Sequence, residues 1–108
     1  MEVKEWKAGD HVWQGDVGFV KIRPEDLPKN LKPKDNTVAY GEATGHCHTF
    51  GNNAKVMIAN DGTQYAILEG QETVTHQEHD NITFPKSVIK VIRQREVDLV
   101  EGVRNVMD

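Results

Sequence analysis

The side chains of this chain that are best suited to chemistry are histidines, and four of the five lie in two short segments. His46 and His48 are separated by one residue, and His76 and His79 by two. Histidine titrates near neutral pH and is also a common ligand of transition metals. If the fold brings the two segments together, they form a candidate site for metal binding or for proton transfer.

The first segment has the spacing of a β-strand. Side chains alternate between the two faces of a strand, so His46 and His48 project from the same side. Two imidazoles on one face can chelate one metal ion or flank one scissile bond. Cys47 then points the opposite way, and we interpret it as a small apolar packing residue. It is the single cysteine of the chain, which excludes an internal disulfide.

The second segment needs a turn to act as one unit. His79 lies three residues beyond His76, so the two rings share a face only if the chain turns after His76, and Asp80-Asn81 is typical of such a turn. Glu78 supplies a carboxylate that could ligate a metal, act as a base or orient an imidazole. The predicted site residues are therefore His46, His48, His76, His79 and Glu78, with Arg95 as a cationic partner.

The first interpretation of this cluster is a mononuclear metal centre with the four histidines as ligands. Neutral imidazoles with a carboxylate fit divalent Zn, Fe, Mn, Ni or Cu. The His-x-His pair, His46 and His48, followed by a distant histidine, also resembles the cupin pattern, and that resemblance implies a metal centre inside a small barrel. The sequence departs from the cupin pattern because no glutamate follows the pair on a clear strand and no second cupin motif is present.

The second interpretation is a metal-independent endoribonuclease. Two histidines can act as general base and general acid, while a cationic side chain stabilises the charged phosphate. The 2′-hydroxyl of single-stranded RNA would be the nucleophile, so the reaction needs neither a metal nor a protein nucleophile. Arg95 is the predicted electrostatic partner, with Arg93 and Lys55 as further candidates, because a guanidinium binds phosphate bidentately.

The third interpretation is a non-catalytic interaction module, in which the histidines are surface residues or hydrogen-bonded core residues. A single histidine is more often of this kind than a ligand or a catalyst. Four in two dense segments shift the balance towards a site. Whether the chain is an enzyme is left open by the sequence.

Strand signals that recur at short intervals, separated by turn residues, predict an all-β fold. We expect one domain over residues 1–108, a small partly closed β-barrel or sandwich of about seven to nine short strands. Three prolines make residues 23–36 a loop, and residues 97–107 could form a short helical turn. The expected strands are 17–22, 37–44, 46–50, 54–59, 63–69, 72–76, 82–84 and 87–93.

Composition excludes several classes of partner. The net charge of −4 lacks the basic footprint of a duplex DNA binder, and it also argues against strong affinity for RNA. No apolar run is long enough to span a membrane, and the N-terminus lacks the apolar core of a signal peptide, so we expect a cytoplasmic protein. Exposed strand edges in so small a domain need cover, which predicts a homo-oligomer.

Four short motifs occur in a fixed order along the chain: Gln14-Gly15-Asp16-Val17, 41–48, 76–79 and Gln94-Arg95-Glu96. Together they resemble an uncharacterised family of short bacterial and phage-encoded β proteins, over roughly residues 11–108. Cys47 replaces a small residue of that pattern and Val97 an aromatic one. The resemblance implies a shared site around the two histidine segments and, for the interaction module, a link to phages. It brings no established activity.

Overall fold

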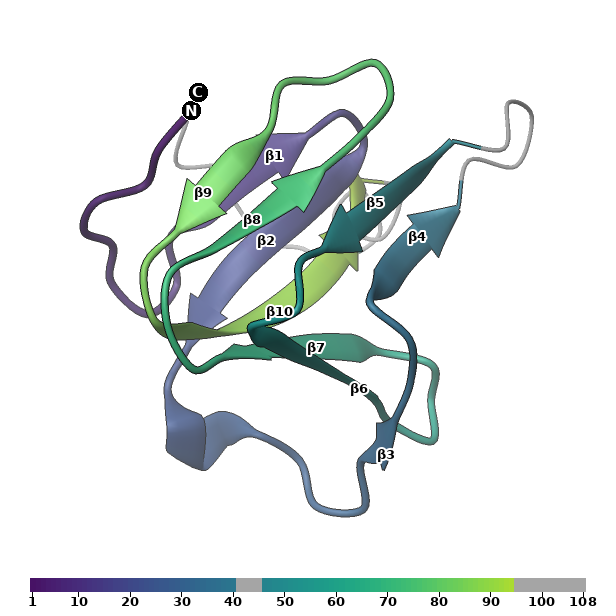
Figure 1. Cartoon of the computed structure of the whole chain (residues 1–108). Coiled ribbons are helices and arrows are strands. Elements are labelled where there is room, and N and C mark those ends of the chain that lie inside the picture. Colours follow the sequence, from purple (N-terminus) through teal and green to yellow (C-terminus); the bar gives the residue numbers. More distant parts are fainter. Residues whose placement is uncertain (41–45, 95–108) are drawn as a thin grey trace.

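A computed structural model describes residues 1–40 and 46–94, and in it the chain forms two antiparallel β-sheets that share one core (Figure 1). The larger sheet has the strand order β1-β2-β10-β7-β6-β3. Its strands are β1 His11–Gln14, β2 Val17–Ile22, β10 Ser87–Arg93, β7 Gln64–Leu68, β6 Ala54–Ile58 and β3 Lys32–Pro33. The smaller sheet has the order β4-β5-β8-β9, with β4 Thr37–Tyr40, β5 Cys47–Phe50, β8 Glu72–Thr75 and β9 Ile82–Phe84.

Side-chain alternation builds the core between the two sheets. On β10, Ile89 and Val91 are buried, whereas Val88 and Ile92 on the other face are only half-buried. Phe19 of the larger sheet lies at the centre of the interior. Its ring meets Phe50 at 5.6 Å and Phe84 at 5.5 Å, both in edge-on geometry. Such aromatic contacts add stabilisation beyond the area that they bury.

The predicted fold class is confirmed as a small all-β sandwich, and the described residues contain ten strands. The two strands beyond the eight expected ranges are β1 and β3. β3 lies within the expected loop 23–36, which also contains a 3-10 turn at Pro24–Asp26. The predicted helical turn at 97–107 lies outside the described residues. No helix in the described ranges has the length and apolarity that a membrane crossing requires.

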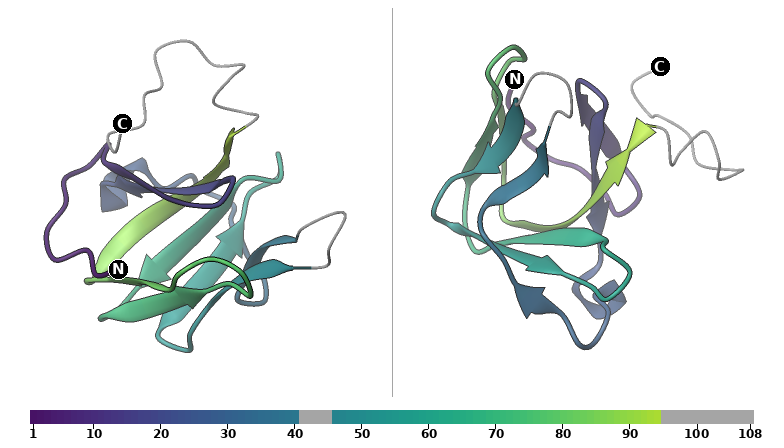
Figure 2. Two further views of the ribbon diagram at one scale, coloured as in Figure 1. Left: turned by 90° about the horizontal axis from the view of Figure 1, so that it is seen from above. Right: turned by 90° about the vertical axis from the view of Figure 1, so that its right-hand side faces the viewer.

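One end of the sandwich collects several connections that are far apart in the sequence. The β1–β2 turn, the start of β5 and the β8–β9 connection lie together at the top of Figure 1 and of the right-hand view in Figure 2. The C-terminal end of β10 reaches the same end of the molecule. Val17, next to the β1–β2 turn, pairs with Gln14 of β1 on one side and with Arg93 of β10 on the other. This end contains both histidine segments.

Candidate functional site

The register of β5 against β8 brings the two histidine segments together. Thr49 pairs with Thr75 and Phe50 with Val74. Continuing this antiparallel register beyond the last pair sets residue 48 opposite residue 76, and residue 46 opposite residue 78. The site is therefore a direct extension of two neighbouring strands.

His76 lies at the centre of the resulting cluster. Its ring centroid is 4.4 Å from that of His48, 4.7 Å from that of His79 and 5.6 Å from that of His46. Glu78 also approaches the cluster, with its Oε1 at 3.4 Å from Nδ1 of His46. Five of the six predicted site residues are thus in one place, and the sixth, Arg95, lies outside the described residues.

His48 is the buried member of the cluster, with 4% of its surface exposed, and a neighbouring amide defines its tautomer. Its Nδ1 lies 2.7 Å from Oε1 of Gln14. The Gln14 Nε2 group donates to the carbonyl oxygens of Asp80 at 2.8 Å and Val74 at 3.4 Å, which fixes the orientation of the amide. Because the amide oxygen can only accept, Nδ1 of His48 carries the proton. Its Nε2 consequently holds a lone pair.

That lone pair is accessible. Among the described residues, the buried side-chain nitrogen and oxygen atoms without a hydrogen bond are His11 Nδ1, Trp13 Nε1 and Gln64 Oε1. Nε2 of His48 also lacks a hydrogen bond, because this ring is bonded through Nδ1 alone. It is absent from the fully buried atoms, so it is not completely enclosed. This nitrogen therefore keeps a small solvent-accessible area, on a residue that is 4% exposed as a whole.

Burial keeps the His48 ring neutral. Loss of hydration lowers its pKa to about 4, and the neighbouring His76 and His79 act in the same direction, while Asp16 opposes them. At pH 7 His48 is therefore a neutral imidazole with a free acceptor nitrogen.

His76 has the opposite tautomer. Its Nδ1 accepts the backbone N–H groups of Glu78 at 3.0 Å and His79 at 3.2 Å, so the proton of the neutral ring lies on Nε2. Burial lowers the pKa of His76, and the nearby His79 and His46 rings add to this effect, against opposition from Glu78 and Asp16. The two central rings thus present one acceptor and one donor.

The cluster also depends on two residues that the sequence did not mark as site residues, Gln14 and Gly15. Gln14 is 2% exposed, and its amide joins β1 to His48 and to the backbone of Asp80, which follows the second histidine segment. Gly15 has φ +63°, and an added Cβ would lie 2.6 Å from Nε2 of His79. The Gln14-Gly15-Asp16 motif was the available signal, but the motif alone does not reveal what its amide contacts.

Substituting Gly15 with alanine should therefore do two things. Alanine is strained in this left-handed backbone conformation, so the free energy of unfolding should fall by about 1–2 kcal/mol. The new methyl group should also displace the His79 ring. Urea unfolding measures the first effect and histidine ring NMR resonances the second. Gly9→Ala is the matched control, because Gly9 has φ +98° with nothing near its Cβ position. An unchanged His79 resonance in Gly15→Ala would contradict the contact.

The metal interpretation finds limited support in this geometry. Within 1–40 and 46–94, no three histidine, cysteine, aspartate or glutamate side chains are arranged to hold a metal ion. His76, the central ring, directs Nδ1 at two backbone N–H groups and carries its proton on Nε2, so neither nitrogen offers a lone pair. The metal centre with its four histidine ligands stays a prediction.

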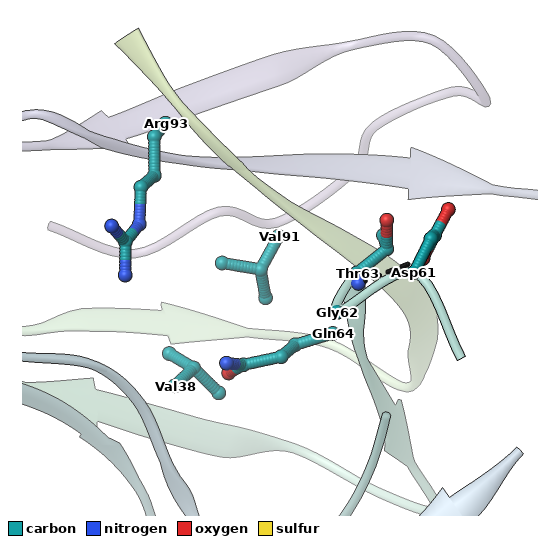
Figure 3. Close-up of a pocket in the computed structure, with 7 residues that line it drawn as sticks. All are labelled: Val38, Asp61, Gly62, Thr63, Gln64, Val91 and Arg93. Carbon is teal, nitrogen blue, oxygen red and sulfur yellow. Dashed lines mark hydrogen bonds between the residues drawn. The ribbon is translucent and has the colours of Figure 1, made fainter. Parts of the chain in front are cut away.

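The cationic candidates differ in position. Lys55 lies on the outer face of β6, where its Nζ is 3.6 Å from Glu69, so it does not serve the cluster. Arg93 points to the inner face of β10 and lines a cavity beside Val38 (Figure 3). His11 lies on the opposite face of β1 from Gln14 and is separate from the cluster.

Comparison with known proteins gives one match. A family model with the description "Domain of unknown function (DUF8820)" matches residues 13–94. That range contains Gln14, both histidine segments and Arg93. No curated protein and no solved structure matches the chain.

Proposed function

Since the chain belongs to the DUF8820 family, whose description names no activity, we propose its function from the site alone: metal-independent acid–base cleavage of single-stranded RNA. One observation carries the proposal. His48 offers an accessible lone pair on Nε2, His76 offers an N–H on Nε2, and their ring centroids are 4.4 Å apart. An acceptor and a donor side by side are what a phosphodiester needs in order to be cleaved by its own 2′-hydroxyl.

In the proposed reaction, Nε2 of His48 removes the proton from the 2′-hydroxyl. The 2′-oxygen forms a bond to phosphorus, and the bond from phosphorus to the 5′-oxygen breaks. The products are a 2′,3′-cyclic phosphate and a free 5′-hydroxyl. His76 donates a hydrogen bond from Nε2 to a non-bridging oxygen, whose negative charge increases in the transition state.

The leaving 5′-oxygen needs a proton, and we assign this role to a protonated His46. It is half-buried, and its Nδ1 lies 3.4 Å from the Glu78 carboxylate, which can orient the ring. His46 returns to the neutral form as His48 gains a proton, so the step conserves protons. Exchange with water then restores both rings.

The negative charges around the site favour a substrate that is bound through contacts at the histidine cluster itself. Asp16 and Glu78 act electrostatically on the histidines and oppose the approach of phosphate. Binding through a broad basic surface is therefore not part of the proposal. We propose a short, flexible single strand whose reacting phosphate meets N–H donors of the cluster.

A metal centre is the second candidate, and one contact favours it. Metal-ligating histidines commonly donate their second ring N–H to a neighbouring oxygen, as His48 does to Gln14. Under this proposal Nε2 of His48 would be a ligand, and His76 would have to change tautomer to become another.

One experiment separates the two candidates. Untagged protein is incubated with a short fluorescent single-stranded RNA in excess EDTA, and the products are analysed by mass spectrometry. We expect cleavage with 2′,3′-cyclic phosphate ends and none in a 2′-O-methyl RNA of the same sequence. Cleavage lost in EDTA and restored by zinc or manganese, with bound metal found by elemental analysis, would replace the first candidate with the second. Absence of cleavage with and without metal would contradict both catalytic proposals.

A further inference from the structure

Arg93 places a positive charge on the core-facing side of the larger sheet. It alternates with the buried Ile89 and Val91 along β10, so it points between the two sheets, and it is half-buried. A guanidinium stays charged at every physiological pH, and a charge that loses part of its hydration favours a partner of opposite sign. None of the ion pairs within residues 1–40 and 46–94 includes Arg93. Its charge is therefore available to an anionic ligand.

The side chain of Arg93 lines a cavity of about 300 Å³ between β4 and the β7–β10 part of the larger sheet (Figure 3). Val38 and Val91 form apolar walls, and Asp61 is the carboxylate in the lining. Arg93 and Asp61 lie on opposite sides of Val91 in Figure 3. Hydrogen bonds from Thr63 lower the pKa of Asp61, and Arg93 does not contribute to this shift. The carboxylate of the cavity thus leaves the guanidinium uncompensated.

Arg93 lies in the same row of the larger sheet as Gln14. It pairs with Val17, and Val17 pairs with Gln14. Two interstrand steps put the backbones of Arg93 and Gln14 about 10 Å apart, and both side chains point to the inner face. The Gln14 amide contacts Nδ1 of His48 at 2.7 Å. This row brings Arg93 towards the buried histidine of the cluster.

The facing sheet gives the same proximity independently. Ala39 of β4 pairs with His48 of β5, and the register shifts between Thr37 and Ala39. Val38 therefore lies in a bulge next to the partner of His48. Val38 is also a wall of the cavity that Arg93 lines. The cavity consequently borders the strand segment that carries His48.

We propose that Arg93 is the phosphate-binding residue at this end of the molecule, and that it holds a phosphate of the RNA strand close to His48. That the phosphate is part of an RNA strand rests on the proposed function, whereas binding of free phosphate does not. The planar guanidinium offers two parallel N–H donors to two phosphate oxygens. A local cation is needed there, because Asp16 and Glu78 bring negative charge to the histidine cluster.

Binding of a 2′-O-methyl RNA, which the proposed reaction cannot cleave, tests the site by fluorescence anisotropy. The unmodified chain should bind it saturably, and Arg93→Gln should weaken binding by about 10- to 100-fold, since a charge-assisted contact is lost. The slope of log affinity against log salt concentration should become shallower by about 0.7, the value for one phosphate contact on a single strand. Lys55→Gln is the matched charge control, because Lys55 lies on the outer face of β6, and it should change neither value.

Arg93→Lys separates the charge from the geometry of the contact and is a second variant in case Arg93→Gln does not fold. Lysine keeps the positive charge but cannot bind two oxygens in parallel. Its affinity should lie between those of the unmodified chain and Arg93→Gln, with the salt slope of the unmodified chain. In single-turnover cleavage, both variants should need a higher protein concentration to reach the half-maximal rate, while the maximal rate changes little.

Titration with inorganic phosphate, followed by backbone NMR at 91–93, distinguishes this site from the proposed function. Shifts that saturate with phosphate and vanish in Arg93→Gln, together with RNA that is bound but not cleaved, would retain the phosphate site and end the proposed function. Equal affinity and equal salt slope of Arg93→Gln and Lys55→Gln for the 2′-O-methyl RNA would overturn the site. It would also be overturned if the unmodified chain bound neither RNA nor phosphate saturably.

Discussion

Replacing His48 with alanine is expected to slow metal-independent RNA cleavage by about 10²- to 10⁴-fold, the usual contribution of a general base. His48 is the ring whose Nε2 lone pair is accessible and whose tautomer is fixed by Gln14. No other histidine of the cluster combines these two properties in the described contacts. Single-turnover rates in excess EDTA, with enzyme in excess over RNA, measure the chemical step apart from substrate binding.

Two further variants make this result interpretable. His11→Ala removes the one histidine outside the cluster and should retain the full rate. Because His48 is buried, its alanine variant could lose structure, so His48→Gln is tested beside it. Glutamine fills a similar volume and can still contact Gln14, but it cannot take up the proton. A folded His48→Gln protein that cleaves at the original rate would rule out His48 as the base.

Much of the fold was predictable because its signals are local. Alternating apolar residues and turn residues define each strand within a few positions, and they predicted the ranges that contain β2, β5 and β10. The two strands that were missed are short and lie at sheet edges. β3 has two residues, one of them Pro33, and exists only through its pairing with β6. Such a strand has no periodic pattern that a sequence could display.

The histidine cluster was predictable for a related reason. Alternation placed His46 and His48 on one face, and a turn after His76 was expected from Asp80-Asn81. The step that the sequence could not provide was the β5–β8 register, which joins segments about 30 residues apart. Register depends on the hydrophobic pattern of both strands and on their connections, and it decides which rings meet.

The protonation pattern of the site was not predictable at all. Gln14 reaches His48 from a strand 34 residues away in the sequence. The tautomer of His76 depends on two backbone N–H groups whose direction follows from the turn at Glu78 and His79. The metal and acid–base interpretations are separated by these contacts, whereas residue types alone fit both.

The depressed pKa of His48 should make the protein less stable at mildly acidic pH. Its pKa is about 4 in the folded chain against 6.5 for an ordinary histidine, so between these values the unfolded chain binds the proton more readily. The stability that comes from keeping this ring neutral is present above about pH 6.5 and is lost as the pH falls towards 4. We expect a loss of about 2 kcal/mol in the free energy of unfolding between pH 7 and pH 4.5 from this ring.

Urea unfolding at the two pH values, for the unmodified chain and for His48→Gln, measures this contribution. The loss of unfolding free energy on acidification is determined for each protein, and the two losses are then compared. Glutamine does not titrate, so the variant should lose less stability on acidification by about the same 2 kcal/mol. His76, whose pKa is also lowered, contributes in the same direction to both proteins and cancels. Asp26, Asp35 and Asp61 have pKa values lowered from 3.8, so their stabilising effect is lost only below this window. Equal pH dependence in the two proteins would show that burial does not lower the pKa of His48 in the folded chain.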